Sequence, residues 1–242
     1  MGPSTRHVLG EFDEQLTAEK WSAAGDAALP DLSGRSAKSP WDWRRSVKRV
    51  ADVTVTLLIM IIVLPLMAAI AVTILLSDGR PILFRQTRVG LHGALFTIFK
   101  FRTMDVDAEA NPSTMVARNE ADGHLFKIRR DPRINPIGRI LRRLSLDELP
   151  QLFNVLNGTM SLVGPRPHLP AEIAELSPDD AHRRSDALPG MTGLWQISGR
   201  TDLDTDTSIA LDLQYIDTWS PRLDIRILFG TIAAVVTARG PH

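Results

Sequence analysis

The chain has 242 residues, and its 28 basic and 28 acidic residues give a formal net charge of zero. This balance removes the bulk electrostatic support that non-specific nucleic-acid binding needs, so no nucleic-acid partner is expected. The absence of cysteine excludes disulfides, thiolate metal sites and cysteine nucleophiles, and it is in keeping with a reducing compartment.

Residues 1–40 are rich in alanine, serine, aspartate and glutamate, and their few apolar residues follow no regular period. We therefore interpret this stretch as a polar, mobile tail. No cleavable signal is visible, because the first apolar run begins too far along the chain and is too long for a signal peptide.

An uncharged apolar run of 24 residues, at positions 53–76, is the strongest signal in the chain. A helix needs about 20 such residues to cross a bilayer, so the run predicts a membrane segment, which we place at residues 41–78. Trp41 and Trp43 stand just before the run, as expected of an interfacial anchor.

Basic residues flank the run on both sides, although cations beside a membrane segment prefer the cytoplasmic face. Those before it are Arg44, Arg45, Lys48 and Arg49, and those after it are Arg80, Arg85 and Arg88. Pro65, near the middle, has no N–H to donate and bends a helix. We therefore favour a re-entrant helix that breaks at Pro65 and leaves by the face it entered. The alternative is an ordinary proline-kinked span, in which neighbouring groups satisfy the freed carbonyls.

Two short alternating segments follow, at residues 81–84 and 95–101. They flank the turn-prone residues 90–93, and their aromatic and β-branched side chains predict a small β-hairpin. Residues 105–124 are polar and acidic, which is typical of a loop or of a solvated helix.

A helical period begins at residue 136 and runs to residue 144. One face carries Arg139, Arg142 and Arg143, and the other carries Ile137, Leu141 and Leu144. Such a helix beside a membrane segment is suited to the bilayer surface. Residues 149–163 continue with a helix-like apolar pattern, and prolines and glycines then mark a loop-rich region. Residues 225–238 are apolar but too short to span, so we interpret them as core or as an interfacial element.

Residues 142–152 hold the densest set of reactive groups, including the adjacent carboxylates Asp147 and Glu148. Adjacent residues of a helix do not face each other, so the two carboxylates would take separate roles. A helix N-terminus and nearby arginines would keep Asp147 ionised and able to attack phosphorus. The pair would also suit magnesium together with substrate phosphates. The structural alternative is a capping box formed by Ser145 and Glu148.

Three further cationic residues are candidates for binding phosphate. Arg166 lies between two prolines that restrict the backbone and lower the entropy lost on binding; otherwise it is an incidental residue of an exposed turn. Lys100 and Arg102 follow an aromatic strand, where they either clamp a phosphate or occupy a solvated strand end.

The remaining signals are weaker. A glycine-rich stretch holds Trp195 and Arg200, which is typical of a loop with a stacking aromatic, although buried tryptophans mostly serve packing. Asp105 and Asp107 have the spacing of the metal-binding DXD motif of many nucleotide-sugar glycosyltransferases. We interpret His168 as a bystander rather than an acid–base group.

Taken together, these blocks resemble the monotopic phosphoglycosyl transferases of the bacterial sugar transferase family. The similarity runs from about residue 48 to residue 240. It consists of the apolar segment with its central proline and of residues 84–90, 100–104, 145–152, 163–167, 190–200, 212–215 and 219–220. So many blocks in order make the match highly specific.

The resemblance implies a membrane-associated, mostly helical α+β fold with a re-entrant N-terminal helix, amphipathic interfacial helices and a cytoplasmic catalytic domain at residues 79–242. It implies transfer of a sugar 1-phosphate from a UDP-sugar to polyprenyl (undecaprenyl) phosphate, with release of UMP. The reaction would take place on the cytoplasmic face of the bacterial inner membrane, as the first membrane step of surface glycan assembly. Homo-oligomerisation is left open.

The resemblance also assigns site residues. Asp147 would be the nucleophile that forms a phosphosugar-enzyme intermediate and a ligand of Mg²⁺, and Glu148 would transfer protons or organise the metal. Phosphates would be bound by Arg85, Lys100, Arg102, Arg142, Arg143, Arg166 and Arg200. Two departures from the family pattern stand out. Larger members carry four more N-terminal transmembrane helices where this chain has a polar tail, and many have serine where Leu64 precedes Pro65.

Two other functions fit the same residues. One is a catalytically silent membrane scaffold that recruits other glycan enzymes. The other is a membrane-anchored glycosyltransferase that uses Asp105 and Asp107 and releases UDP. The nucleotide released from a UDP-sugar separates the three: UMP, none, or UDP.

Overall fold

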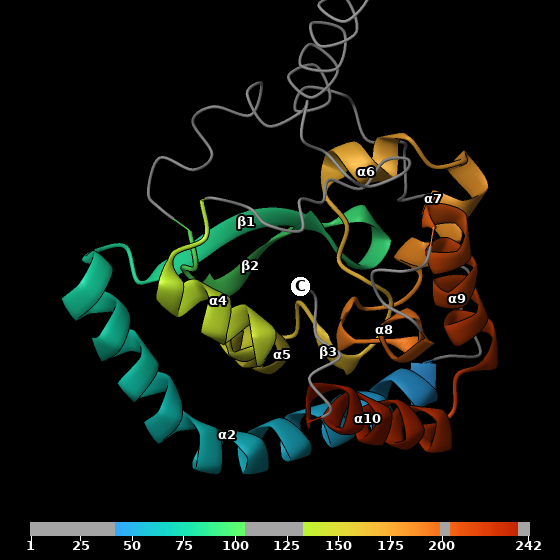
Figure 1. Cartoon of the computed structure of the whole chain (residues 1–242). Coiled ribbons are helices and arrows are strands. Elements are labelled where there is room, and N and C mark those ends of the chain that lie inside the picture. Colours follow the sequence, from blue (N-terminus) through green and yellow to red (C-terminus); the bar gives the residue numbers. More distant parts are fainter. Residues whose placement is uncertain (1–41, 105–132, 199–203, 237–242) are drawn as a thin grey trace, which may run out of the picture.

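The computed structural model describes residues 42–104, 133–198 and 204–236. In this part of the chain, helices surround two small two-stranded sheets (Figure 1). The predicted mostly helical α+β fold is therefore confirmed. The predicted tail, Trp41, the acidic stretch with Asp105 and Asp107, and Arg200 lie outside the described residues.

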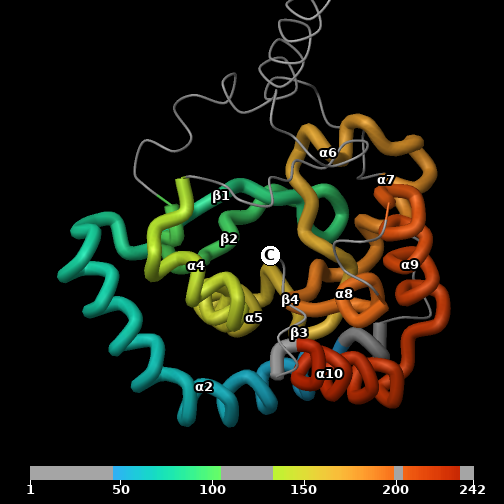
Figure 2. Tube along the Cα trace, viewed as in Figure 1, coloured from blue at the N-terminus to red at the C-terminus, as the bar shows by residue number. Residues whose placement is uncertain are grey.

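The membrane segment is one long helix, α2 (Asp42–Asp78), with Pro65 inside it. Figures 1 and 2 show that α2 curves around the body of the molecule and changes direction on the way. A proline that cannot donate its N–H accounts for such a bend. The helix stays continuous, so Pro65 bends α2 without breaking it. Among the described residues, Ser46–Asp78 is the helix long and apolar enough to cross a membrane.

One stripe of α2 packs against the rest of the chain along its whole length. In the N-terminal half, Val55, Ile59 and Met60 pack against the central core. In the C-terminal half, the buried Met67, Ile70 and Ile74 contact Phe101 and Leu141. The opposite stripe exposes large aliphatic side chains, among them Val50, Leu57, Leu58, Ile61, Ile62, Leu66, Val72 and Leu76.

Polar contacts hold the N-terminal half of α2 to α5 (Gln151–Asn157). The Arg49 guanidinium donates to the carbonyls of Val155 and, at 2.8 Å, Leu156. These carbonyls belong to the last turn of α5, where intrahelical donors run out, although the Val155 carbonyl also accepts from the Gly158 N–H at 3.2 Å. The Asp52 carboxylate accepts from the Ser161 hydroxyl at 2.7 Å. This end of α2 is thus docked on the protein through buried hydrogen bonds.

The predicted hairpin is confirmed. Strands β1 (Leu83–Val89) and β2 (Leu95–Phe101) pair antiparallel around a short 3₁₀ turn, η1 (Leu91–Gly93). Phe96 and Ile98 alternate along β2 and are buried in the central core, whereas Phe101 is buried in a second apolar cluster with residues of α2 and α4.

The predicted basic helix is α4 (Pro136–Arg143), capped by the Asn135 side chain. Leu141 is buried, as predicted, but Leu144 is 41% exposed because the chain leaves the helix there. Gly138 presses against the backbone of Thr103: a Cβ there would meet the Thr103 carbonyl oxygen at 2.2 Å. Only glycine therefore allows α4 to lie this close to the end of β2.

The prediction of helix throughout residues 149–163 is wrong. α5 ends at Asn157, and Gly158 follows with a φ of 87°, a left-handed conformation that ends helices. The chain then forms β3 (Ser161–Val163), which pairs in parallel with β4 (Gly190–Thr192). A run of buried apolar residues suits helix and strand equally, so periodicity could not separate them.

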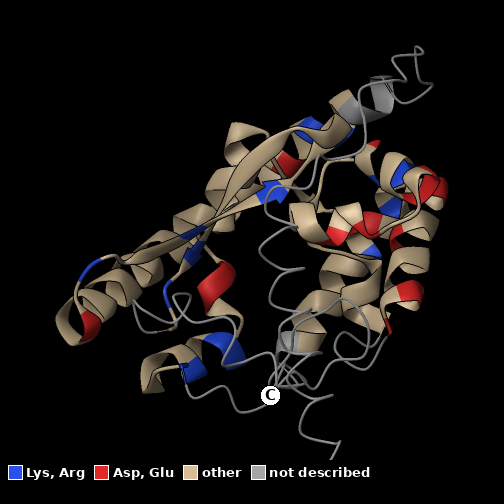
Figure 3. Cartoon of the chain, turned by 90° about the horizontal axis from the view of Figure 1, so that it is seen from above, with Lys and Arg blue, Asp and Glu red and all other residues tan. Residues whose placement is uncertain are grey.

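The remaining helices form a lobe beside the hairpin. They are α6 (Pro170–Ala174), α7 (Pro178–Ser185), α8 (Leu194–Ser198), α9 (Thr205–Thr218) and α10 (Pro221–Val236). The charged side chains of α7 are of both signs, whereas those of α9 are aspartates. Figure 3 shows basic (blue) and acidic (red) residues close together in the helical part of the molecule. Both interpretations of the last apolar element hold in part: Ile227 of α10 is fully buried, whereas Ile225, Phe229 and Ile232 are exposed.

Candidate active site

A cavity of about 1240 Å³ lies between α2, the hairpin, α4, α5 and the turn η2 (Leu146–Glu148). Its lining brings together segments from four parts of the chain. Cationic residues on it are Arg80, Arg85, Arg88, Lys100, Arg102 and Arg142, and the acidic ones are Asp147 and Glu148. Apolar residues on it include Leu64, Met67, Ala68, Ala71, Ile82 and Phe153. The carboxylate pair predicted from the sequence therefore lies on the wall of this cavity.

The capping box predicted as the structural alternative is wrong. Ser145 adopts a left-handed backbone conformation with a φ of 54° and makes no side-chain cap. Asp147 and Glu148 lie in the three-residue turn η2, and α5 begins only at Gln151. The two carboxylates are therefore not the first turn of a helix.

Asp147 is 8% exposed. Burial raises the pKa of its carboxyl to about 6, and the nearby Glu148 charge adds to the rise, while Lys100 and Arg142 oppose it. The sequence argument relied on arginines and a helix end to keep the acid ionised, and it left out burial. At pH 7 a carboxyl with this pKa is still roughly nine-tenths ionised, so Asp147 remains a usable nucleophile.

Glu148 is paired with Lys100, whose ammonium lies 2.8 Å from the Glu148 carboxylate. Both side chains are partly exposed and line the cavity. The ion pair joins η2 to strand β2 and fixes the Glu148 carboxylate against that strand.

The side chain of Asn154 fixes α5 against the same strand. It is fully buried, and its amide oxygen accepts from the Phe99 N–H at 3.1 Å. Its amide nitrogen donates to the Thr97 carbonyl at 2.7 Å. These bonds hold α5 against residues 97–99 of β2, directly before Lys100.

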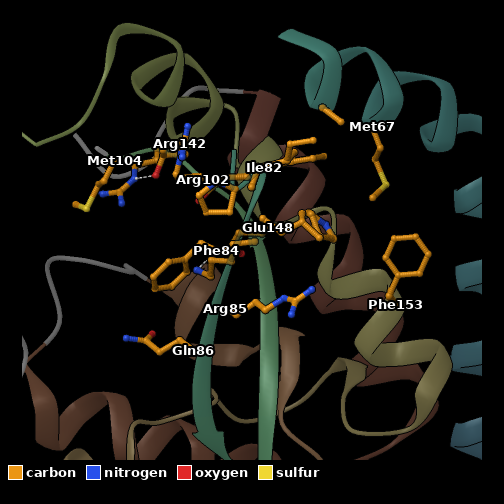
Figure 4. A pocket seen from close by; sticks show the side chains of 18 of the residues that line it. Met67, Ile82, Phe84, Arg85, Gln86, Arg102, Met104, Arg142, Glu148 and Phe153 are labelled. Atoms are coloured by element: carbon orange, nitrogen blue, oxygen red, sulfur yellow. Dashed lines mark hydrogen bonds and ion pairs between the residues drawn. The ribbon is translucent and has the colours of Figure 1, made fainter. Parts of the chain in front are cut away.

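Arg142 enters the cavity from α4. Its Nε donates to the Thr103 hydroxyl at 2.8 Å, which directs the guanidinium toward the site (Figure 4). Thr103 is buried at the end of β2, next to Gly138. The sequence analysis overlooked Thr103, although it directly follows the Lys100–Arg102 block.

Arg102 has a different role from the predicted one. Its guanidinium donates to the carbonyls of Asp78 at 2.7 Å and Gly79 at 3.2 Å, at the C-terminal end of α2. It therefore caps the membrane helix, where a cation also complements the helix dipole. Arg85, by contrast, reaches into the cavity from β1 with no hydrogen bond to another described residue (Figure 4).

Two predicted phosphate ligands do not reach the cavity. Arg143 points to solvent from the same turn of α4 that carries Arg142. The Arg166 guanidinium stacks on the Trp195 ring, 5.1 Å from its centroid. The aromatic residue of the glycine-rich stretch thus packs against a protein cation.

Arg166 borders a second, closed group of charges. Arg184 and Asp212, both almost fully buried, form an ion pair at 2.5 Å. The Glu172 carboxylate lies 3.5 Å from His168 and 3.8 Å from Arg88. Burial and the three arginines lower the pKa of His168 well below its usual value, so this histidine is neutral, as the bystander interpretation expects.

Arg88 lies between the cavity and this closed group of charges. It is not among the phosphate ligands predicted from the sequence. It lines the cavity, and its guanidinium also donates to the Pro167 carbonyl at 3.0 Å. Burial lowers the pKa of Arg88 to about 10, so it keeps its charge at pH 7.

The carboxylates of Asp147 and Glu148 are the residues of the cavity that suit a hard divalent cation. Mg²⁺ is commonly held by one or two carboxylates together with substrate phosphates and water. The described residues contain no group of three or more acidic or histidine side chains. The donor set therefore fits a metal shared with a phosphorylated substrate.

The chain matches the family model described as bacterial sugar transferase over residues 43–238. It is 44% identical over 205 residues to undecaprenyl-phosphate galactose phosphotransferase of Salmonella typhimurium, which covers 82% of this chain and 42% of that protein. It is 40% identical over 208 residues to undecaprenyl-phosphate glucose phosphotransferase of Komagataeibacter xylinus, covering 82% and 37%.

A shorter relative matches nearly end to end. Exopolysaccharide production protein ExoY of Sinorhizobium fredii is 40% identical over 199 residues, covering 81% of this chain and 88% of the relative. The chain thus spans about two fifths of the longer relatives and most of the shorter one.

Proposed function

The chain belongs to the bacterial sugar transferase family, and from this we propose that it transfers a sugar 1-phosphate from a UDP-sugar to polyprenyl phosphate. The names of the Salmonella and Komagataeibacter relatives specify undecaprenyl phosphate, and galactose or glucose as the sugar. The observation that carries the proposal is the cavity itself. It places a buried aspartate among cations and extends to the membrane helix.

In the first half of the reaction, an Asp147 oxygen attacks the phosphorus that carries the sugar. The bond from Asp147 to phosphorus forms, the bond bridging the two phosphates breaks, and UMP leaves with the bridging oxygen. Arg85, Lys100 and Arg142 surround the reacting group and neutralise the charge on its oxygens. Asp147 attacks readily because burial has removed much of its hydration.

In the second half, an oxygen of polyprenyl phosphate attacks the same phosphorus and the bond to Asp147 breaks. The carboxylate is regenerated and polyprenyl-diphosphate-sugar is released. Asp147 and Glu148 would hold Mg²⁺, which would supply further neutralisation of the phosphate oxygens. The covalent step lets UMP leave before the lipid arrives, so the two substrates need not occupy the cavity together.

We propose that α2 is re-entrant and that the catalytic body lies on the cytoplasmic face. The supporting observation is that both halves of α2 pack on the same body. Arg49 and Asp52 hold the first half to α5 and β3, and Ile70 and Ile74 pack the second half against Phe101. A bilayer cannot separate two ends that contact one compact body, whereas the exposed aliphatic stripe between them suits lipid.

The reaction is tested with purified protein, a panel led by UDP-galactose and UDP-glucose, and undecaprenyl phosphate. We expect UMP and a lipid diphosphate sugar, and with donor alone a phosphosugar adduct on Asp147 by mass spectrometry. Chelation of magnesium should stop UMP release. Release of UDP would instead support a DXD glycosyltransferase, and no nucleotide release from any donor would support a scaffold.

Topology is tested in the naturally cysteine-free chain. Single cysteines at the exposed positions Ser46 and Ser77 lie at the two ends of α2. We expect both Ser46→Cys and Ser77→Cys to react with an impermeant maleimide only in inverted vesicles. Labelling of the two positions from opposite sides would establish a true span.

A further inference from the structure

The cavity has two chemically different sides. Figure 4 shows Met67 of α2 and Phe153 of α5 facing each other on one side, with Arg102, Arg142 and Met104 on the other. Arg85 and Glu148 lie between them. A ligand that fills the whole cavity must therefore be apolar at one end and anionic toward the middle.

Phe153 is the least expected residue on the apolar side. It is 42% exposed and belongs to none of the apolar clusters formed by the described residues. Two other apolar residues of α5, Leu152 and Val155, are in the core, and Leu156 is half-buried. A large aromatic ring turned into a cavity six residues after Asp147 is suited to contact a ligand there.

The facing wall of α2 leaves room for such a ligand. It consists of Leu64, Met67, Ala68 and Ala71, which recur at three- and four-residue intervals and so share one face of the helix. Two of the four are alanines, so the groove between α2 and Phe153 is open rather than filled by side chains. Leu64 and Ala68 remain exposed in it.

We propose that the groove between α2 and Phe153 binds the first isoprene units of the polyprenyl phosphate acceptor; this inference rests on the proposed function. The phosphate would then lie toward Arg85, with the chain leaving along α2 into the bilayer. The charge pattern supports this orientation, because the residues of α2 that line the cavity are all apolar, whereas Arg85 lies in the middle of it (Figure 4). A nucleotide or sugar placed there would leave its polar groups unpaired.

The opposite side of the cavity is left for the donor. Arg142 and Met104 lie there (Figure 4), and Thr103, whose hydroxyl accepts from Arg142, lines the same cavity. Donor and acceptor would thus approach Asp147 from different directions. The arrangement accounts for how one buried carboxylate serves a water-soluble substrate and a lipid in turn.

The test uses two variants that change the groove without touching charged residues: Phe153→Ala removes the ring, and Ala68→Phe fills the space. We expect each to raise the KM for undecaprenyl phosphate about ten-fold, the usual scale for a lost apolar contact in a pocket. The KM for the UDP-sugar and the yield of the donor-only adduct should stay unchanged. Phe229→Ala, an equally large change on an exposed face of α10 away from the cavity, is the matched control.

A second measurement does not depend on turnover. A polyprenyl phosphate with a diazirine in its first isoprene unit should crosslink to residues 64–71 and 153, also in Asp147→Asn. Unchanged lipid KM in both variants, or labelling elsewhere, would overturn the groove assignment while leaving the transferase intact. If the native protein forms no adduct and releases no UMP with any donor, the proposed function fails instead.

Discussion

Two groups of cationic side chains in this protein use their charge in opposite ways. The cavity cations, Arg85, Lys100 and Arg142, surround Asp147 and face open space. The buried arginine cluster, Arg88, Arg166 and Arg184, is closed by Glu172, Asp212, Trp195 and backbone carbonyls. Each group contains residues predicted from the sequence to bind phosphate, Lys100 in the first and Arg166 in the second.

The difference shows which feature of a basic motif indicates function. In the buried cluster each arginine contacts a carboxylate, a backbone carbonyl or an aromatic ring of the protein. Its charge is therefore compensated within the fold. Among the described residues, six cationic and two acidic side chains line the cavity, and this positive lining suits a phosphorylated substrate. A surplus of charge facing an open cavity is therefore a better indicator than the motif alone.

The largest expected effect comes from Asp147→Asn. We expect turnover to fall by about 10⁴-fold or more, equivalent to about 5.5 kcal/mol, because the nucleophile is lost. Thermal or denaturant unfolding at pH 7 should show equal or greater stability, since burial disfavours the charge that the variant removes. Asp206→Asn on the exposed first turn of α9 should change neither quantity. Full activity in Asp147→Asn would exclude this residue as the nucleophile.

Substitutions in the buried arginine cluster should lower the free energy of unfolding, because these residues lie in the fold and not at Asp147. Arg184→Met leaves Asp212 buried without its counter-charge, which costs about 3–5 kcal/mol of unfolding free energy. The neighbouring Arg183→Met is the matched control: its ion pair with Asp217 is exposed and should contribute less than about 1 kcal/mol. Denaturant titration of both variants measures the contrast. Equal losses in the two variants would mean that the closed cluster is not structural.

The adjacent residues Arg142 and Arg143 of α4 allow a direct comparison of a cation that lines the cavity with one that does not. Arg142→Met should lower kcat/KM about 100-fold, or about 2.7 kcal/mol, because a donor to the developing phosphate charge is lost. Arg143→Met should leave activity unchanged, since Arg143 lies outside the cavity. Steady-state UMP release measures both. A comparable loss in Arg143→Met would restore its predicted role as a ligand.

The smallest effect is that of pH. Since the pKa of Asp147 is about 6, activity should fall tenfold per pH unit below that value, about 1.4 kcal/mol per unit. The folded-state pKa exceeds the ordinary 3.8, so protonation of Asp147 stabilises the fold as the pH falls through this window, and the loss is not unfolding. Lys100→Met removes a charge that lowers the pKa, so its acid limb should move to higher pH. If activity began to fall only below pH 4, the pKa of Asp147 would not be raised by burial.

Sequence periodicity predicted the local elements well. The apolar length of α2, the alternation in β1 and β2 and the helical period of α4 each depend on residues close together in the chain. The carboxylate pair was found for the same reason, because Asp147 and Glu148 are adjacent. The strand β3 was missed because its partner β4 lies far along the chain and a buried apolar run has no distinguishing period.

The sequence by itself determined that this protein has a membrane helix, a hairpin and a pair of acids beside arginines, because patterns of neighbouring side chains specify such features. Only the tertiary structure decided which arginines face Asp147, that Arg102 caps α2 and that Arg166 stacks on Trp195. The physical reason is that a side chain's role depends on its burial and on partners distant in sequence. Chain folding sets both of these, and they in turn govern charge and pKa.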